Sequence, residues 1–151
     1  MKKFLFDLDD TLYSPIDHGN RDDSFYESLK KDKELSSLLK KTKNNYIFTN
    51  GNKEHMDECL KRMQIKSFFK GATYSDMFNG KYKPDLIPYL ITARTFNFKK
   101  NDIIFYFEDL IDNLKTGKKF GWITIYIDHE KKMKRKPKYI DLVFYNIHDA
   151  I

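Results

Sequence analysis

The chain has 151 residues, enough for one domain with a buried core, and its many aromatic residues with few glycines and prolines exclude a disordered chain. Its single cysteine, Cys59, excludes an intrachain disulfide and fits a reducing compartment. The net charge of +6 comes from one basic loop, which runs from Lys131 to Lys138 and holds six basic residues and no acid. Without this basic loop, basic and acidic residues are equal in number.

Targeting signals are not expected in this sequence. The first predicted strand begins within a few residues of Met1, which leaves no room for a signal peptide. No apolar run approaches the length of about 20 residues that a membrane span needs. We therefore expect a cytoplasmic protein with no membrane segment, and the basic loop leaves a nuclear location open.

The first predicted element is a strand that ends in carboxylates. Residues 4–11 read Phe-Leu-Phe-Asp-Leu-Asp-Asp-Thr, and a short apolar run of this kind predicts a buried parallel strand. Asp7, Asp9 and Asp10 cannot be buried unpaired, so we expect them at the carboxyl end of the strand, where open α/β sheets bind ligands. Three neighbouring carboxylates repel one another unless a cation lies among them, and Mg²⁺ prefers such oxygen ligands. The alternative is an acidic surface turn.

The next segment, residues 14–28, is polar and rich in turn-forming residues, which predicts a loop with one short helical piece near residues 25–29. The turn-forming residues are Pro15, Asp17, Gly19 and Asn20. From there on, apolar spacing predicts helices at residues 33–43, 53–63, 85–96 and 110–120, and strands at residues 46–48, 71–74, 102–107, 122–127 and 142–145. Residues 146–151 are expected to form a tail. This alternation predicts an α/β fold of the Rossmann-like three-layer type, with a mostly parallel sheet and helices on both faces.

Polar side chains follow several of these strands. They are Asp7, Asp9 and Thr11, then Thr49, Asn50 and Gly51, then Lys83 from a loop, and then Glu108 and Asp109. Parallel strands end along one edge of a sheet, so these groups can converge. Together they supply what phosphoryl transfer needs: a carboxylate nucleophile, a second carboxylate as acid and base, fixed donors and a cation for the phosphoryl oxygens, and ligands for Mg²⁺.

These residues also resemble a known family. Residues 7–11 are similar to motif I of the haloacid dehalogenase superfamily, residues 48–51 to motif II, the Lys-Pro pair at residues 83–84 to motif III, and residues 107–109 with Asn113 to motif IV. The four motifs occur in the family's order and cover the predicted sheet from Phe4 to Ile127. Within the superfamily, the chain looks most like the pyrimidine 5′-nucleotidase branch.

The resemblance implies a Mg²⁺-dependent phosphatase that works through a phospho-aspartate. Asp7 would be the nucleophile and a metal ligand, and Asp9 the general acid and base, which also binds the metal through its backbone carbonyl. Thr11 would support the loop geometry. Asp109 would bind the metal directly, with Glu108 beside it or one water away.

The resemblance also implies the residues that bind the phosphoryl group. Thr49 would hold a phosphoryl oxygen, helped by backbone donors at Asn50 and Gly51, and Lys83 would offset the negative charge. Each has a plainer interpretation: Thr49 could cap the following helix, and Lys83 could be a solvated lysine. His55 is expected to be exposed on its helix, and the apolar stripe from Met56 to Met63 is expected to belong to the core.

The resembling nucleotidases usually carry a helical cap, a segment that covers the active site, between motifs I and II, and this chain departs from them there. Only residues 12–32 remain there for a cap, so we expect one core domain over residues 1–151, with the cap missing or reduced to a loop. An open site could act on a nucleoside monophosphate or on a macromolecular phosphate. The basic loop could attract such polyanions, or it could be a solvated connection.

Two other functional classes remain open. A signalling receiver domain also uses acids, a threonine and a lysine on a parallel sheet, but there the phosphorylated aspartate stands alone on a middle strand. A non-catalytic binding module is the second alternative, and the intact motif residues argue against it.

Overall fold

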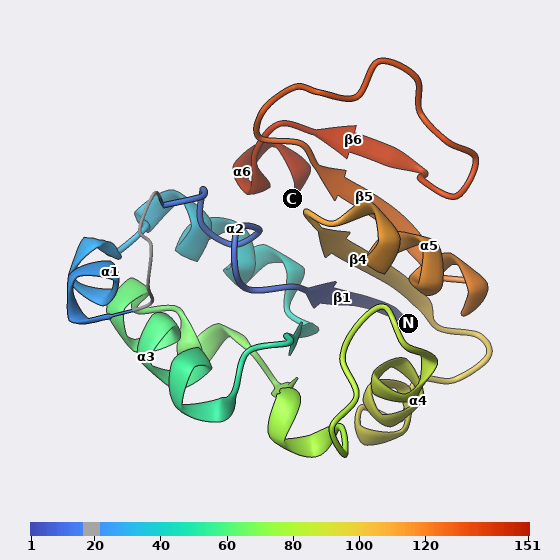
Figure 1. The fold of residues 1–151 in the computed structure, drawn as a ribbon, viewed down its shortest axis with the longest axis horizontal. Helices are drawn as coiled ribbons and strands as arrows, with labels where there is room; N and C mark the ends of the chain where they lie inside the picture. Colours follow the sequence, from blue (N-terminus) through green and yellow to red (C-terminus); the bar gives the residue numbers. More distant parts are fainter. Residues whose placement is uncertain (17–21) are drawn as a thin grey trace.

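The computed structural model describes residues 1–16 and 22–151, and their six strands form one parallel sheet (Figure 1). The strands are β1 (Lys2–Phe6), β2 (Asn45–Phe48), β3 (Gly71–Thr73), β4 (Ile103–Glu108), β5 (Ile123–Ile127) and β6 (Leu142–Phe144). Their order across the sheet is β3-β2-β1-β4-β5-β6. The predicted α/β fold is confirmed, and every pair of neighbouring strands is parallel.

The register of the central strands brings three chain segments to one level. Phe6, the last residue of β1, pairs with Ile47 in β2 and with Phe107 in β4. The chain runs outward from β1 through β2 to β3 and then returns to β4 on the other side of β1. The crevice outside the carboxyl ends of β1 and β4 is therefore a topological switch point, the usual ligand site of such sheets.

Helices cover both faces of the sheet, as predicted. They are α1 (Asp23–Ser28), α2 (Lys33–Thr42), α3 (Lys53–Met63), α4 (Leu86–Thr95), α5 (Ile111–Lys119) and α6 (Ile147–Ala150). One apolar cluster joins Phe6 to buried residues of α1, α2, α3 and α6, and a second joins Leu5 to buried residues of α4 and α5 (Figure 1). Neighbouring strand residues point to opposite faces, so each buried strand needs apolar side chains on both sides. The stripe from Met56 to Met63 lies in the first cluster, as expected.

The end of the chain differs from the prediction. Residues 146–151 were expected to be a tail, but Ile147–Ala150 form the short helix α6. The Asn146 side chain caps it by accepting a hydrogen bond from the Asp149 backbone N–H at 2.9 Å. Ile147 is buried against the sheet, and this tertiary contact stabilises a helix too short to form alone.

The segment between β1 and β2 is reduced, as expected for residues 12–32. Its described residues form the six-residue helix α1 and the following α2, and α1 packs on α3. The turn predicted from Asp17, Gly19 and Asn20 lies outside the described residues. In the described part of the chain, no helix is long and apolar enough to span a membrane.

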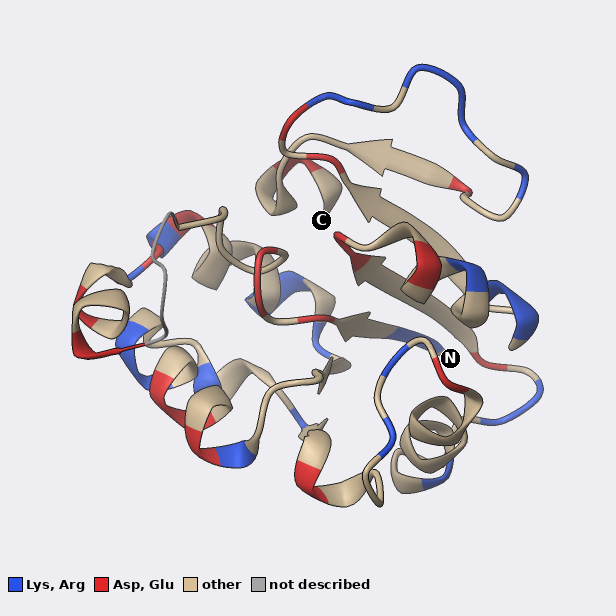
Figure 2. Ribbon diagram, in the orientation of Figure 1, with Lys and Arg blue, Asp and Glu red and all other residues tan. Residues whose placement is uncertain are grey.

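The basic loop forms the connection between β5 and β6. Figure 2 shows its lysine and arginine residues in blue along that connection, while acidic red segments follow β1 and β4. The Asp128 carboxylate accepts hydrogen bonds from the backbone N–H groups of Lys132 and Met133, which fixes the start of the loop. The basic side chains beyond this point are mostly exposed.

Candidate active site

Lys83 lies at the centre of the polar cluster at the carboxyl ends of β1 and β4. Its side chain is only 1% exposed, and its ammonium donates to Asp7 Oδ1 at 3.0 Å, to Glu108 Oε2 at 2.9 Å and to the Phe48 carbonyl at 2.8 Å. These three bonds use all three protons of the ammonium group. Lys83 is therefore not a solvated surface lysine, the plainer interpretation of the sequence.

Asp7 and Asp109 converge on one hydroxyl. Thr11 Oγ1 lies 2.9 Å from Asp7 Oδ2 and 3.1 Å from Asp109 Oδ1. A hydroxyl has one proton and can donate to only one of these oxygens at a time. Two carboxylate oxygens thus face each other with one donor between them, which leaves negative charge uncompensated.

Glu108 is completely buried and accepts five hydrogen bonds. Oε2 accepts from Lys83, from the Tyr106 hydroxyl at 3.0 Å and from the Asn113 amide at 3.1 Å, and Oε1 accepts from the backbone N–H groups of Asp109 and Leu110. Both oxygens are therefore engaged within the protein. This geometry suits a residue that holds Lys83 and the backbone of Asp109 in place.

The segment after β2 contributes Thr49, Asn50 and Gly51. Thr49 is buried, and its Oγ1 accepts from the Gly51 backbone N–H at 3.0 Å. The cap of α3 is instead Asn52, whose side chain accepts from the His55 backbone N–H, so Thr49 does not cap the helix. The Asn50 side chain makes two hydrogen bonds to the backbone of Lys83, at 2.8 and 3.2 Å, and so fixes the loop that carries the lysine.

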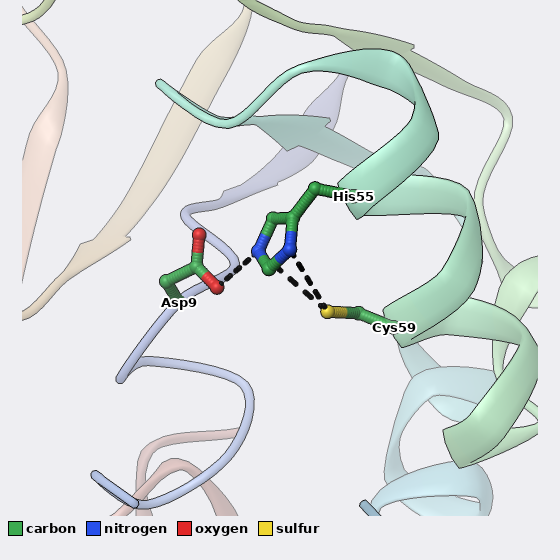
Figure 3. Close-up of side chains that lie close together, drawn as sticks. All are labelled: Asp9, His55 and Cys59. Atoms are coloured by element: carbon green, nitrogen blue, oxygen red, sulfur yellow. Dashed lines mark hydrogen bonds and ion pairs between the residues drawn. The ribbon is translucent and has the colours of Figure 1, made fainter. Parts of the chain in front are cut away.

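Asp9 lies beside the same cluster, held by one side chain of its own segment and one of α3. Its Oδ1 is 2.7 Å from His55 Nε2 (Figure 3). The same oxygen also bonds the Tyr13 hydroxyl. The His55 side chain is only 13% exposed, so the expectation that it is exposed on its helix was wrong. His55 comes four residues before the buried Cys59, and this helical spacing was a signal that its ring faces inward.

The charges in the cluster shift the pKa of each buried group. Burial and the neighbouring Glu108 raise the pKa of Asp7 well above its usual value, although Lys83 acts against them. Burial and Glu108 also raise the pKa of Asp109, to about 7. Burial disfavours the charged forms of Lys83 and Glu108, but the charges of Asp7 and Glu108 outweigh it and raise the pKa of Lys83, and the charge of Lys83 outweighs it and lowers the pKa of Glu108.

A small pocket opens between these groups. Its volume is about 160 Å³, and among the described residues that line it are five carboxylates and one cation, Lys83. The lining residues are Asp7, Asp9, Asp10, Thr49, Asn50, Lys83, Glu108, Asp109, Leu110 and Asn113. Of the residues predicted to act in catalysis or to bind substrate or metal, all except Gly51 line this pocket, and Gly51 lines the adjoining groove with Asp9. Their roles stay predictions, but their convergence is observed.

The donor set fits a hard divalent cation. Carboxylate oxygens of Asp7, Glu108 and Asp109 lie within 4.8 Å of one another. The oxygens of Asp7 and Asp109 share a single hydroxyl donor, and a cation between them would favour the ionised carboxylates, which burial and the charge of Glu108 disfavour by raising the pKa of both residues. Mg²⁺ takes oxygen ligands of this kind and keeps positions open for water or phosphate oxygen.

Comparisons with known proteins point to one family. A family model described as haloacid dehalogenase-like hydrolase matches residues 20–127. No curated protein sequence matches the chain.

Solved structures share the fold at low sequence identity. A dehalogenase superposes with a TM-score of 0.69 at 21% identity, over 84% of this chain and 57% of its own. The L-2-haloacid dehalogenase from Xanthobacter autotrophicus, with chloropropionic acid covalently bound, superposes with a TM-score of 0.68 at 13% identity, over 87% and 66%. The putative HAD hydrolase YfnB from Bacillus subtilis, bound to magnesium, superposes with a TM-score of 0.66 at 19% identity, over 78% and 51%. This chain thus spans between one half and two thirds of the length of these structures.

Proposed function

Because the chain belongs to the haloacid dehalogenase-like hydrolase family, we propose that it is a Mg²⁺-dependent phosphomonoesterase that works through a phosphorylated Asp7. The observation that carries the proposal is the position of the Asp7 carboxylate. The Lys83 ammonium bonds one oxygen of this carboxylate at 3.0 Å, and the Thr11 hydroxyl bonds the other at 2.9 Å. Asp9 and Asp109 line the same pocket. The pocket has one carboxylate for each role that phosphoryl transfer requires.

The residues divide the work as follows. An oxygen of Asp7 attacks phosphorus, Asp9 donates a proton to the leaving oxygen, and Asp9 later takes a proton from the attacking water. Thr49 and Lys83 meet the negative charge of the phosphoryl oxygens. Asp7, Asp109 and the Asp9 backbone carbonyl would hold Mg²⁺, which supplies further neutralisation of that charge. Glu108 acts through the hydrogen bonds that hold Lys83 and the Asp109 backbone.

The size of the pocket bears on the substrate. About 160 Å³ has room for a phosphoryl group but is below the 300 Å³ or more of typical small-molecule sites. The rest of the substrate would therefore lie outside the pocket. A nucleoside monophosphate is one candidate, in line with the resemblance to pyrimidine 5′-nucleotidases.

A macromolecular phosphate is the second candidate, favoured by the position of the basic loop. His129 Nε2 lies 2.5 Å from the Asp10 carbonyl, so the chain enters the basic loop directly beside the segment that follows β1. A polyanion drawn to this loop could present a terminal phosphate to the pocket. A phosphate-ended oligonucleotide hydrolysed better than a nucleoside monophosphate, with a strong salt dependence, would support this candidate.

A haloacid dehalogenase is the main competing activity, because several structural neighbours have it. There, a carboxylate nucleophile attacks carbon and a halide ion leaves. A halide needs no proton from a second acid, and the reaction has no phosphoryl oxygens whose charge a metal ion must neutralise. The presence of Asp9 and Asp109 beside Asp7 therefore favours a phosphate ester.

One pair of assays separates these activities. The protein is incubated with a panel of phosphate monoesters and, separately, with L-2-chloropropionate, each with Mg²⁺ and with a chelator. We expect phosphate release that requires Mg²⁺, and acid-stable labelling of the protein that is lost in Asp7→Asn. Chloride release without phosphate release would overturn the proposal in favour of the dehalogenase.

A further inference from the structure

His55 connects the proposed acid–base residue to a second helix. Its Nε2 lies 2.7 Å from Asp9 Oδ1, and its Nδ1 lies 2.7 Å from the hydroxyl of Tyr26 in α1 (Figure 3 shows the contact with Asp9). The ring is thus held at both nitrogens between the segment after β1 and the short helix that stands where a cap would be. None of the four sequence motifs includes it.

The hydrogen bonds fix the direction of each donor. An ionised Asp9 can only accept, so in a neutral ring Nε2 carries the proton and Nδ1 accepts from the Tyr26 hydroxyl. The Tyr13 hydroxyl bonds the same oxygen of Asp9. Two contacts on Oδ1 prevent the carboxylate from rotating about its side-chain bond.

The other oxygen of Asp9, Oδ2, lies toward the segment that follows β2. A Cβ atom built on Gly51 would be 3.5 Å from Asp9 Oδ2, 3.3 Å from Thr49 Oγ1 and 2.8 Å from His55 Cδ2. Oδ2 therefore lies near the segment expected to bind the phosphoryl group, while Oδ1 faces His55. The backbone at Gly51 approaches the His55 ring so closely that a side chain there would displace it.

A metal site is the competing interpretation of this cluster, since Asp9, His55 and Cys59 offer three ligand atoms within 4.8 Å. Cys59 Sγ lies 3.7 Å from Nε2 and 3.9 Å from Nδ1 of the ring. A sulfur nearly equidistant from both nitrogens is aligned with neither lone pair. The hydrogen bonds to Asp9 and Tyr26 already use the in-plane positions, so this arrangement does not coordinate an ion.

We propose that His55 is a positioning residue: it holds Asp9 so that Oδ2 meets the leaving-group oxygen of the substrate. The inference rests on the proposed phosphatase activity and deepens it. A groove of about 790 Å³, lined by Asp9, Tyr26, Gly51 and His55 among others, adjoins the phosphate pocket between α1 and α3. The leaving group would lie in this groove, and the pairing of Tyr26 with His55 gives α1 a role that a cap would otherwise fill.

In the proposed reaction, Asp9 transfers one proton in each of two steps. In the first step Asp7 forms a bond to phosphorus, the bond from phosphorus to the leaving oxygen breaks, and the proton on Asp9 Oδ2 moves to that oxygen to give the alcohol. In the second step Asp9 takes a proton from water, the water oxygen bonds to phosphorus, and the bond to Asp7 breaks. The carboxylate of Asp7 and inorganic phosphate are the products, and both acids return to their starting states.

The test compares two substrates that differ in their need for the proton. p-Nitrophenolate leaves readily without one, whereas the alkoxide of a simple alkyl phosphate does not. The constant kcat/KM covers the reaction only up to departure of the leaving group. We expect His55→Phe to lower kcat/KM for the alkyl phosphate by about 10- to 100-fold, part of the effect of general acid catalysis, and for p-nitrophenyl phosphate by less than about threefold.

Rescue and control variants separate positioning from folding. His55→Gln keeps an N–H donor at similar reach, and we expect it to recover most of the alkyl phosphate activity. His148→Phe is the matched control, because His148 Nε2 also bonds a carboxylate, Asp32, at 2.6 Å, but neither residue lines the phosphate pocket. Its ratio of alkyl to aryl activity should equal that of the unmodified protein. If His55→Phe folds poorly, Tyr26→Phe removes only the partner of Nδ1 and should still lower the ratio, by about threefold.

The outcomes are distinguishable. Equal losses on both substrates in His55→Phe, or no loss on either, would refute the positioning role while leaving the phosphatase intact. Failure of His55→Gln to raise the ratio above that of His55→Phe would also refute it. If the unmodified protein releases no phosphate from any monoester, the phosphatase itself is refuted and the inference falls with it.

Discussion

Replacing Lys83 by methionine tests the electrostatic centre of the site. The ammonium bonds Asp7 and Glu108 at 3.0 and 2.9 Å, and its side chain is 1% exposed. Methionine fills a similar volume but leaves two buried carboxylates without their cation. Removing one partner of a buried ion pair costs about 3–5 kcal/mol, because the remaining charge stays buried. For a chain of this size, that corresponds to a fall in melting temperature of about 6–20 °C.

The assay is urea unfolding without Mg²⁺ at pH 8, where the acids have the greatest tendency to ionise. Lys118→Met is the matched control: Lys118 Nζ lies 2.8 Å from an Asp141 oxygen, but the two side chains are 38% and 32% exposed. A solvent-exposed pair of this kind contributes about 0–1 kcal/mol. Both lysines make ion pairs at 2.8–3.0 Å, but Lys83 is buried between two carboxylates and Lys118 is exposed beside one, so the difference between the variants measures the combined effect of burial and of the second carboxylate.

A second substitution checks the cause. In the double variant Lys83→Met/Asp7→Asn, one of the two buried carboxylates that lost their cation is replaced by a neutral amide, and we expect at least about 1 kcal/mol of the loss to be recovered. If Lys83→Met costs no more than Lys118→Met, the reasoning is refuted. If the double variant is as unstable as the sum of the single variants, the carboxylates are not the origin of the loss.

Three further predictions concern the acids and the loop around them. The folded-state pKa of Asp109, about 7, lies above its unfolded value of about 4, so the metal-free protein should lose stability as pH rises from about 4 through 7. Mg²⁺ should therefore raise the melting temperature more at pH 8 than at pH 5.5, and an equal rise at both would contradict this assignment. Asp7→Asn should lower kcat by about 10⁴-fold or more while removing a repelled carboxylate, so its metal-free melting temperature at pH 8 should not fall; a marked fall would contradict the raised pKa. Gly51→Ala should destabilise the fold by about 1–3 kcal/mol and lower alkyl phosphate hydrolysis, because its Cβ would lie 2.8 Å from His55 Cδ2; unchanged activity and stability would show that the ring moves freely.

Much of the fold was readable from local patterns. The predicted helix at residues 53–63 matches α3, and Pro88 lies in the first turn of α4, where a missing N–H group does no harm. Gly121 follows α5 with a φ of 78°, as expected after a helix end. Residues 146–151 were misread because α6 depends on the burial of Ile147 against the sheet, which no local pattern reports. The spacing of Asn146 and Asp149 was the one available signal of a capped helix.

Convergence of the motif residues also followed from the sequence, because carboxyl ends of parallel strands share an edge. The hydrogen bonds that each of these residues makes did not follow from the sequence. Thr49 and the backbone of Asn50 were expected to bind phosphate, which stays a prediction, and the structure adds that Thr49 accepts from the Gly51 N–H and that the Asn50 side chain fixes the backbone of Lys83. Glu108 was expected beside the metal or one water away, which stays a prediction, and its five hydrogen bonds to the protein were not foreseen. Such partners depend on distances of about 3 Å between segments far apart in the chain, which no sequence spacing encodes.

The sequence by itself determined that acids end a buried strand, that further polar groups end its neighbours, and that little chain remains for a cap. These follow from hydrophobic burial, because apolar runs must be covered and charged residues must stay at their ends. Only the tertiary structure decided which groups touch: Lys83 between Asp7 and Glu108, and His55 between Asp9 and Tyr26. A hydrogen bond tolerates a change of only a few tenths of an ångström in the distance between donor and acceptor. Here these distances are set by the strand register and by the packing of α1 on α3.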